Sequence, residues 1–550
     1  MKIVLAEKVS PATLAILQKE PGWNCVTADK ITDLPAELAD ADALIVRSAV
    51  QADAKLLAAA PKLRIIGRAG VGVDNIDAEE ATKRGIVVMN TPGANAVAVA
   101  ELTLGLMISM ARAIPRANAT MHAGKWDKKS LQGSELRGKT LGIVGCGRIG
   151  LEVARRAKAF GMNLLGYDPF IAPVIARENG VTLVPIDDIF SSSDFLSLHV
   201  GLTPQTEGLI NKTSIAIMKK GIRIINCARG ELIVDAALAE AIKSGHVAGA
   251  ALDVFRQEPL KDSPYFELDN VLLSPHIAGS TDEAQEAIGI QLANQVRDYL
   301  KLGVVQNAVN VASLSEEEYA EVSPYIEMAA RLGQLLGHAA GSGGNSSAAG
   351  SVESIALTYN GRLAQLKTDM IRNAAIAGVL HGADAVNRIN ASAAAAERGI
   401  RVQEDKREHV SGGTGATLRL SLHWSNGTAQ GDWTGVATVL HGHSPRLLSY
   451  DGIDIEAELA GTLVVIRNQD VPGVIGRIGT ILGEAKLNIA NFALGRSSAA
   501  RNSGVPAGQA LAVVQLDVPA ESQPALLQAL AELRKVEAIT SVRVVELGKL

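Results

Sequence analysis

The sequence predicts an α/β protein with two doubly wound parallel sheets, followed by an α+β segment and a ferredoxin-like unit at the C-terminus. Three observations predict this fold class. Strand-like and helical segments alternate over the first 90 residues, the alternation restarts at residue 139, and six elements from residue 461 run strand, helix, strand, strand, helix, strand. Because parallel strands need long crossover connections, such alternation indicates sheets covered by helices on both faces.

The first alternating region contains short runs of aliphatic and β-branched residues separated by helical patterns. The expected strands are KIVLAE (2–7), ALIVRS (43–48), LRIIGRAG (63–70) and IVVMN (86–90). The segments PATLAILQK, AKLLAAA and DAEEATKRG are expected to be helices or connections. An apolar helix, AVAVAELTLGLMISMA (96–111), and a basic loop, MHAGKWDKKS (121–130), follow them.

A second α/β unit is expected to end near residue 282. Its strands are expected in KTLGIVGCGRIG, MNLLGYDP, FLSLHV, IRIINCARG, VAGAALDVF and NVLLSPHI. The helical segment 282–303 comes next, and at about 1.5 Å per residue it is long enough to return the chain to the first unit.

The character of the chain changes near residue 310. A helical stretch (311–338) precedes a Gly/Ser-rich segment, AAGSGGNSSAAG (339–350), which is typical of a loop or tether. The strand SVESIALTYNG, an Ala-rich helical region (365–398) and further strand-like stretches reach residue 455. From residue 461 the six elements GTLVVIR, GVIGRIGTILGEAK, NIANFALGR, ALAVVQLDV, QPALLQALAEL and ITSVRVVEL give the βαββαβ order, with a polar insert, SSAARNSGVPAGQ, in the middle hairpin.

Composition argues against several classes of protein. A length of 550 residues favours three or four domains, and the net charge of −5 gives no reason to expect nucleic acid or an anionic membrane as a partner. Cys25, Cys146 and Cys227 lack paired or metal-like spacing, which favours a reducing cytosol and no metal site. The most apolar helix is interrupted by Glu101 and falls short of the roughly 18–20 residues that a bilayer span requires. We therefore expect a cytoplasmic protein.

The stretch LGIVGCGRIG places three glycines between a buried strand and a helix. Gly145 permits a tight turn, Gly147 lets a pyrophosphate approach the backbone, and Gly150 lets the helix pack on the strand. Asp168 ends the next strand, close to the offset of about 20 residues expected for an acid that binds ribose hydroxyls. Because a carboxylate there would repel a 2′-phosphate, the pattern predicts NAD rather than NADP.

Three chemically active residues follow later strands of the same unit. Arg229 follows IRIINCA, Glu258 follows AALDVF, and His276 follows NVLLS. The carboxyl ends of parallel strands converge on the ligand crevice of such sheets. Dehydrogenation of a 2-hydroxy acid needs a base for the hydroxyl proton and a cation for the carboxylate, which His276 and Arg229 would supply. A carboxylate on the other ring nitrogen, from Glu258, would fix the tautomer.

Each of these residues also has an ordinary structural interpretation. A single histidine is more often structural than catalytic, Arg229 could pair with a surface acid, and Glu258 could be a solvated turn residue. His199 also lies at a strand end and is the main alternative to His276, whereas His246 lacks comparable partners.

The motifs GCGRIG, NCARG, DVFRQEP and SPHIAGST, in that order, resemble the D-isomer-specific 2-hydroxyacid dehydrogenases. The segments VRSA, GRAGVGVDNID and NTPGANAVAVAE, together with the tail, are similar to the long-form D-3-phosphoglycerate dehydrogenases within that family. The resemblance implies a Rossmann-type NAD domain (95–282) inserted in a flavodoxin-like substrate domain (1–94 and 283–310). It further implies an intervening domain (311–455) and a C-terminal ACT regulatory domain (456–550).

The resemblance also implies roles for individual residues. Arg229 would orient the substrate, Glu258 would be the catalytic carboxylate and His276 the acid/base. NAD contacts are implied for Gly145, Gly147, Arg148, Ile149, Gly150, Asp168, Cys227, Ala228, Asp253, His276 and Gly279. Substrate contacts are implied for Arg47, Ser48, Gly70, Val71, Gly72, Asn95, Arg229 and His276.

Arg47 is the expected phosphate ligand, because a guanidinium can bind phosphate in a forked geometry. Lys128 and Lys129, in the basic loop, would either reach into a partner subunit or be solvated. In the tail, Asn468, Asp470 and Asn488 fall on the family's serine-binding positions, although Asn468 stands where a histidine or an aromatic residue is usual.

The resemblance implies a homodimeric or homotetrameric enzyme that oxidises 3-phosphoglycerate to 3-phosphohydroxypyruvate with NAD, the entry step of serine synthesis. Serine would be its effector at the ACT domain. One alternative is a glyoxylate or hydroxypyruvate reductase acting on a non-phosphorylated acid. Another is a non-enzymatic NAD-sensing interaction protein, and a third is an ACT unit that senses an amino acid other than serine.

Overall fold

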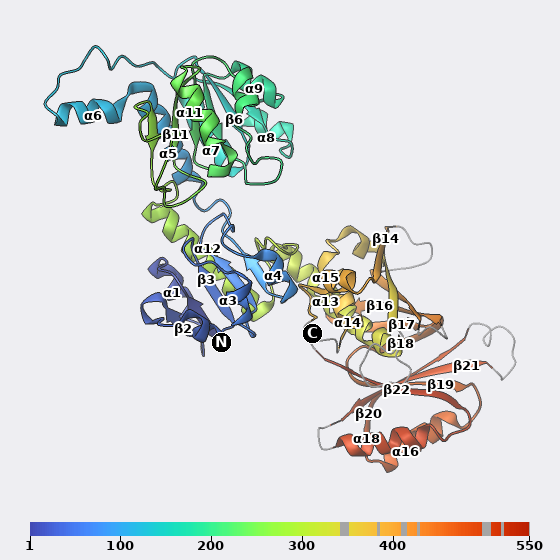
Figure 1. Cartoon of the computed structure of the whole chain (residues 1–550). Coiled ribbons are helices and arrows are strands. Elements are labelled where there is room, and N and C mark those ends of the chain that lie inside the picture. Colours follow the sequence, from blue (N-terminus) through green and yellow to red (C-terminus); the bar gives the residue numbers. More distant parts are fainter. Residues whose placement is uncertain are drawn as a thin grey trace.

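The computed structural model describes residues 1–340, 351–381, 386–408, 415–425, 430–497, 508–518 and 522–548, and its strands form four sheets (Figure 1). The α/β fold class with two parallel sheets is confirmed. The Gly/Ser-rich segment from 341 to 350 and most of the polar insert, 498–507, lie outside the described residues.

The first sheet is entirely parallel and has the order β2-β1-β3-β4-β5. Its strands are β1 (Lys2–Leu5), β2 (Asn24–Thr27), β3 (Ala43–Val46), β4 (Ile65–Arg68) and β5 (Val87–Met89). One face packs on α1 (Pro11–Leu17) and α12 (Asp282–Leu302), and the other on α2 (Leu34–Leu38), α3 (Ala54–Ala58) and α4 (Ala78–Lys83). The expected strands and helices are confirmed, whereas β2 and α2 were not anticipated.

The second sheet is also parallel, with the order β12-β11-β10-β9-β6-β7-β8, so the strand order reverses between β9 and β6. Its strands are β6 (Thr140–Val144), β7 (Asn163–Tyr167), β8 (Thr182–Leu183), β9 (Phe195–Leu198), β10 (Ile222–Asn226), β11 (Val247–Leu252) and β12 (Val271–Leu273). The helices α5 (Ala96–Arg112) and α7 (Arg148–Ala159) cover one face. The helices α9 (Ile186–Ser192), α10 (Lys212–Ile217) and α11 (Asp235–Lys243) cover the other, while α8 (Pro173–Glu178) precedes the short β8.

Helix α12 returns the chain from the second sheet to the first, as its length predicted. Thr281 caps its N-terminus, and Gly303 ends it in a left-handed conformation. Leu292 and Val296 pack against Gly67 of β4, where a Cβ would lie 3.0 Å from Leu292. The absence of a side chain at Gly67 therefore lets the helix approach the sheet.

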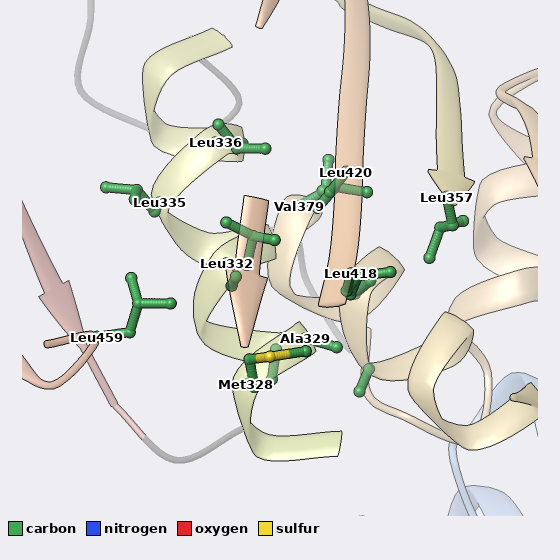
Figure 2. Packing of buried hydrophobic residues seen from close by; sticks show 14 of the residues in the cluster. Met328, Ala329, Leu332, Leu335, Leu336, Leu357, Val379, Leu418, Leu420 and Leu459 are labelled. Atoms are coloured by element: carbon green, nitrogen blue, oxygen red, sulfur yellow. The ribbon is translucent and has the colours of Figure 1, made fainter. Parts of the chain in front are cut away.

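The third sheet is mixed, with the order β14-β13-β15-β16-β17-β18. It contains β13 (Ser351–Asn360), β14 (Arg401–Arg407), β15 (Thr417–Ser425), β16 (Gln430–Leu440), β17 (Ser444–Tyr450) and β18 (Ile453–Glu458). Helices α13 (Glu316–Ala340), α14 (Asp369–Val379) and α15 (Ala391–Glu397) share one hydrophobic core with it. A Cβ on Gly378 would lie 2.1 Å from the Ala330 carbonyl, so glycine permits the close approach of α13 and α14. Figure 2 shows the leucine-rich core between α13 and β15.

The fourth sheet has the order β20-β21-β19-β22, which is the ferredoxin-like arrangement predicted from the element order. It comprises β19 (Gly461–Gln469), β20 (Asn488–Arg496), β21 (Gln509–Asp517) and β22 (Ile539–Leu547). Helices α16 (Val474–Glu484) and α18 (Gln523–Leu533) cover one face, and the other face joins the core of the third sheet.

Helix α6 (Ile114–His122) follows α5 and, with the loop after it, projects away from the second sheet (Figure 1). Within the described part of the chain, no single helix is long and apolar enough to cross a membrane; α5 and α6, bent by 64° relative to each other, meet that test only as a pair, by length and composition.

Candidate functional site

The strands that precede the predicted catalytic residues end side by side in the second sheet. In the register of β10, β11 and β12, Asn226 pairs with Leu252 and Leu252 pairs with Leu273. The loops that carry Arg229, Glu258 and His276 therefore leave the same edge of the sheet, next to one another.

The imidazole of His276 is hydrogen-bonded to a carboxylate. Its Nδ1 lies 2.7 Å from Oε2 of Glu258, and Oε1 of Glu258 accepts a 3.0 Å bond from the Phe255 N–H. Both side chains stay accessible, at 49% exposed for His276 and 36% for Glu258. Since Nδ1 is engaged, Nε2 is the ring atom that can exchange a proton with a ligand.

The turn that presents His276 is organised by the fully buried carboxylate of Asp253. Oδ1 of Asp253 accepts bonds from Ser274 Oγ (2.6 Å) and the Ile277 N–H (3.0 Å), and Oδ2 accepts one from the Ala278 N–H (2.9 Å). His276 itself has a φ of 50°, a conformation uncommon outside glycine. The buried carboxylate therefore holds the backbone in the conformation that brings the imidazole to Glu258.

Arg229 joins the second sheet to the loop after β4. Its guanidinium donates from Nε to Asp74 at 3.0 Å and from NH1 to the Ala228 carbonyl at 2.6 Å. A Cβ on Gly72 would lie 1.8 Å from NH2 of Arg229, so the guanidinium lies directly against this glycine. The buried Asn226 fixes the turn, because its side chain bonds Ala228 N and Arg229 O.

Arg68, at the end of β4, is a site residue that the sequence analysis missed. Its guanidinium lies against Gly70, which has a φ of 150° and whose Cβ would lie 1.4 Å from NH1 of Arg68. Burial and the nearby positive charge of Arg229 lower the pKa of Arg68. Its Nε finds no hydrogen-bond partner in the described chain. The motif GRAG could have drawn attention to this arginine, because it comes just before the predicted substrate contacts Gly70, Val71 and Gly72.

Other predicted substrate residues border the same loop. Arg47 donates from its N–H to Glu7 and from NH1 to the Lys8 carbonyl, and Ser48 is exposed. The carbonyl of Gly70 accepts from Thr91, and that of Val71 accepts from the Asn90 side chain at 2.5 Å.

Asn95, the N-terminal residue before α5, faces Gly279 of the His276 loop. A Cβ on Gly279 would lie 3.2 Å from Nδ2 of Asn95. Oδ1 of Asn95 is buried and accepts no hydrogen bond from the described residues. The carbonyl of Gly279 accepts from the Gln285 side chain, which ties the loop to α12.

The glycine turn between β6 and α7 fits a dinucleotide pyrophosphate. Gly145 has a φ of 93°, and a Cβ there would lie 2.6 Å from the His199 carbonyl. A Cβ on Gly150 would lie 2.0 Å from the Gly145 carbonyl, whereas one on Gly147 would meet nothing within 4 Å. Gly147 therefore opens onto free space at the helix N-terminus, where backbone N–H groups favour phosphate.

The other predicted NAD residues differ in their burial and in their hydrogen-bond partners. Asp168 accepts backbone N–H groups of Cys146, Phe170 and Ile171, which fixes its carboxylate after β7. Arg148 reaches the Pro92 carbonyl before α5, and Ile149 is half-buried against the core. Cys227 is buried, which raises its thiol pKa to about 12, and Ala228 donates to Asn226.

His199, the alternative to His276, is half-buried, and its Nδ1 is shielded from solvent. Burial lowers its pKa to about 4, so its imidazole is neutral at pH 7. Nε2 lies 2.8 Å from Ser197 Oγ, while Nδ1 is buried with no partner in the described structure. No carboxylate pairs with it among the described residues, which disfavours a role in proton transfer.

The three predicted effector residues do not meet within one chain. Asn468 is buried in β19 and Asp470 pairs with Arg496 at 3.0 Å, at the end of β20. Asn488 begins β20 and donates to Asp517, at the opposite end of the sheet. A single site using all three residues would therefore need a second chain.

Two family models match separate parts of the chain. The NAD-binding domain of D-isomer specific 2-hydroxyacid dehydrogenases matches residues 104–278, and the intervening domain of D-3-phosphoglycerate dehydrogenases matches residues 321–450.

Relatives named D-3-phosphoglycerate dehydrogenase match the full length. The one from Methanocaldococcus jannaschii is 38% identical over 555 residues and covers 100% of both chains. That from Bacillus subtilis is 38% identical and covers 99% of both.

Solved structures resemble the N-terminal part. A glyoxylate reductase from Paecilomyes thermophila has a TM-score of 0.52 at 31% identity, covering 56% of this chain and 98% of its own. A D-lactate dehydrogenase from Aquifex aeolicus, in complex with NAD and lactic acid, has a TM-score of 0.51 at 28% identity, covering 57% and 100%.

Proposed function

Because the chain belongs to the D-3-phosphoglycerate dehydrogenase family, we propose that it oxidises the C2 hydroxyl of 3-phospho-D-glycerate to give 3-phosphohydroxypyruvate, the first step of serine synthesis. The main support is the 2.7 Å contact between His276 and Glu258, which lie at the same edge of the second sheet as Arg229.

His276 takes the hydroxyl proton at Nε2, and Glu258 stabilises the resulting imidazolium through Nδ1. Arg229 holds the substrate carboxylate and the nascent carbonyl oxygen with its planar guanidinium. The glycine turn Gly145–Gly150 and the carboxylate of Asp168 would hold NAD, which when bound would supply the hydride acceptor.

The charge around the loop after β4 suits a substrate with two anionic groups. Three arginines, Arg47, Arg68 and Arg229, lie near one another there, and the carboxylates of Asp74 and Glu7 offset part of their charge. The cluster has one more guanidinium than carboxylate, and a guanidinium can bind either a carboxylate or a phosphate in a forked geometry. This arrangement favours phosphoglycerate over the alternative, a glyoxylate or hydroxypyruvate reductase acting on a smaller, singly charged acid.

The test is NADH formation from 3-phosphoglycerate compared with D-glycerate and glycolate at equal concentrations. A larger kcat/KM for the phosphorylated acid is expected. Equal or greater rates with the non-phosphorylated acids would favour the reductase, and no NADH with any 2-hydroxy acid would favour a non-enzymatic NAD-binding protein.

We also propose the division into substrate (1–94, 283–310), NAD (95–282), intervening (311–455) and ACT (456–550) domains, which the four sheets support. Serine as an effector of the ACT domain is part of this proposal. A titration of serine into the NADH assay, beside other amino acids, tests it.

A homo-oligomer is proposed from the projecting arm of α6 and its loop. Trp126 is 83% exposed and Met121 55% on this arm, and a partner subunit that covered them would remove their apolar surface from water. The three free cysteines support a cytosolic location.

A further inference from the structure

A cavity of about 450 Å³ lies between the unit of the first sheet and helices α14 and α15, away from the predicted catalytic residues. Four segments of the chain form its walls: the end of α4, the stretch after α12, the start of α14 and the start of α15. Its lining residues are Thr82, Val309, Asn310, Val311, Ala312, Asp369, Arg372, Asn373, Ile389, Ser392 and Ala393. The volume is within the range of about 300–1,000 Å³ typical of small-molecule sites.

The polar groups of the cavity carry both signs of charge. Arg372 lies 3.1 Å from Asp369 and donates to Glu404 at 2.9 Å, so two carboxylates already balance its charge. This balance disfavours a ligand with a net negative charge and favours a neutral one that carries both charges, which can bind Asp369 and Arg372 together. Asp369 is 52% exposed, which leaves it able to receive a cationic group.

Amide and hydroxyl groups lie beside this pair. Oδ1 of Asn373 accepts from Ser392 Oγ at 2.6 Å and from Arg372 Nε at 3.4 Å. Nδ2 of Asn373 is therefore the atom of this amide that can donate to a ligand. Valine, isoleucine and alanine side chains make up much of the remaining wall. The cavity thus combines the carboxylate of Asp369, the guanidinium of Arg372, the amide of Asn373 and an apolar surface.

We propose that this cavity binds a small zwitterion of α-amino-acid size, with its ammonium group on Asp369 and its carboxylate on Arg372 and Asn373. The site is distinct from the active site and from the predicted effector positions in the fourth sheet. Its binding chemistry goes beyond the proposed function and does not depend on it.

The cavity touches an element that leads to the active site. Thr82, near the end of α4, accepts from the Asn310 side chain at 2.9 Å. Asn390 donates to the Lys83 carbonyl at 2.9 Å and Asn387 to that of Gly85 at 3.3 Å, which fastens this end of α4 to the third-sheet unit.

The other end of α4 begins just after the loop that holds Arg229. Asp77 caps the helix three residues beyond Asp74, whose carboxylate accepts from Arg229. A ligand wedged between Thr82 and α14 would therefore act on a short helix joined to the substrate loop, and we expect it to change the KM for the acid. This kinetic effect rests on the proposed function.

Isothermal titration calorimetry of the full chain with L-alanine tests the site. Propionate and ethylamine, which each lack one of its charges, serve as matched probes. Heat of binding is expected with L-alanine and not with either probe. The Asp369→Asn and Ser392→Leu variants, which remove the charge and fill the cavity, should bind L-alanine at least about tenfold more weakly, the loss expected for one charged hydrogen bond.

Two variants locate the binding. Asp405→Asn removes an exposed acid on β14 outside the cavity, and Asp470→Asn alters the predicted effector position; both should bind L-alanine normally. No binding of L-alanine, equal binding of propionate, unchanged binding by both cavity variants, or loss only in Asp470→Asn would overturn the proposal. If L-alanine binds as expected but no acid is oxidised, the proposed function fails while the site stands.

Discussion

The guanidinium of Arg229 donates from Nε to the carboxylate of Asp74 at 3.0 Å, across 155 positions of sequence. This ion pair connects the end of β10 to the loop after β4, so it links the two parallel sheets at the predicted substrate site. Asp74 is 61% exposed, and exposed pairs contribute little to stability. The contact therefore matters for the position of the guanidinium more than for the fold.

Asp74→Asn is expected to lower kcat/KM for 3-phosphoglycerate by about tenfold, because a displaced orienting group costs catalysis without loss of fold. Steady-state kinetics and the thermal unfolding temperature measure the two effects separately. Glu240→Gln, which removes an exposed acid paired with Lys212, is the matched control and should change neither. An unchanged kcat/KM in Asp74→Asn would show that the pair does not position Arg229.

His276→Ala should lower kcat by roughly 10²–10⁴-fold, the range for loss of one general acid/base, with little change in NAD affinity. Glu258→Gln keeps a hydrogen-bond acceptor near Nδ1 but removes the charge that stabilises imidazolium, so a smaller loss is expected. Stopped-flow measurement of NADH formation, with NAD binding followed by fluorescence, separates the two steps. Near-normal turnover in His276→Ala would refute the assignment.

The sequence was sufficient to predict the glycine turn and the meeting of His276 with Glu258. The spacing of Gly145, Gly147 and Gly150 defines a strand–turn–helix, and the rule that parallel strands end together anticipated that His276 and Glu258 would meet. Asp74 and Arg68 lie in no motif whose chemistry is visible in the sequence, and their importance follows from contacts between separate sheets. Asn488 matched its motif, yet the strand register puts it at the opposite end of β20 from Asp470.

Arg68→Gln is expected to raise the KM for 3-phosphoglycerate by about 10–100-fold, the value of a hydrogen bond to a charged group, and that for D-glycerate by less. Gly70→Ala should reproduce this effect, because its methyl group would occupy the place of the Arg68 guanidinium. Gly415→Ala is the control: its φ of 128° is comparable to the 150° of Gly70, but a Cβ there meets nothing within 4 Å, so it tests backbone strain alone. An equal rise in KM for both acids would argue against a phosphate contact.

Ser274→Ala should lower kcat several-fold, by roughly the factor expected for one lost hydrogen bond, while the KM for NAD stays constant. Asp253→Asn should lower kcat further and also reduce the unfolding temperature, because its amide would set a donor against the N–H or O–H groups that the carboxylate now accepts. If Asp253 acted only as an NAD contact, Ser274→Ala would keep full kcat and Asp253→Asn would change only the KM for NAD.

The free energy of unfolding is expected to decrease as the pH is lowered, because of His199. Burial lowers its folded-state pKa to about 4 from the usual 6.5, so between these values the unfolded chain binds a proton that the folded chain does not. The folded state is therefore favoured above pH 6.5 and loses about 2 kcal/mol from this group by pH 5. The buried Nδ1, which has no partner in the described structure, explains why the charged form is poorly tolerated.

His199→Gln should reduce the drop in unfolding temperature between pH 7 and pH 5 by roughly 4–8 °C, whereas replacement of the exposed His122 should not. Identical drops in wild type and His199→Gln would mean that this imidazole is already solvated in the folded protein.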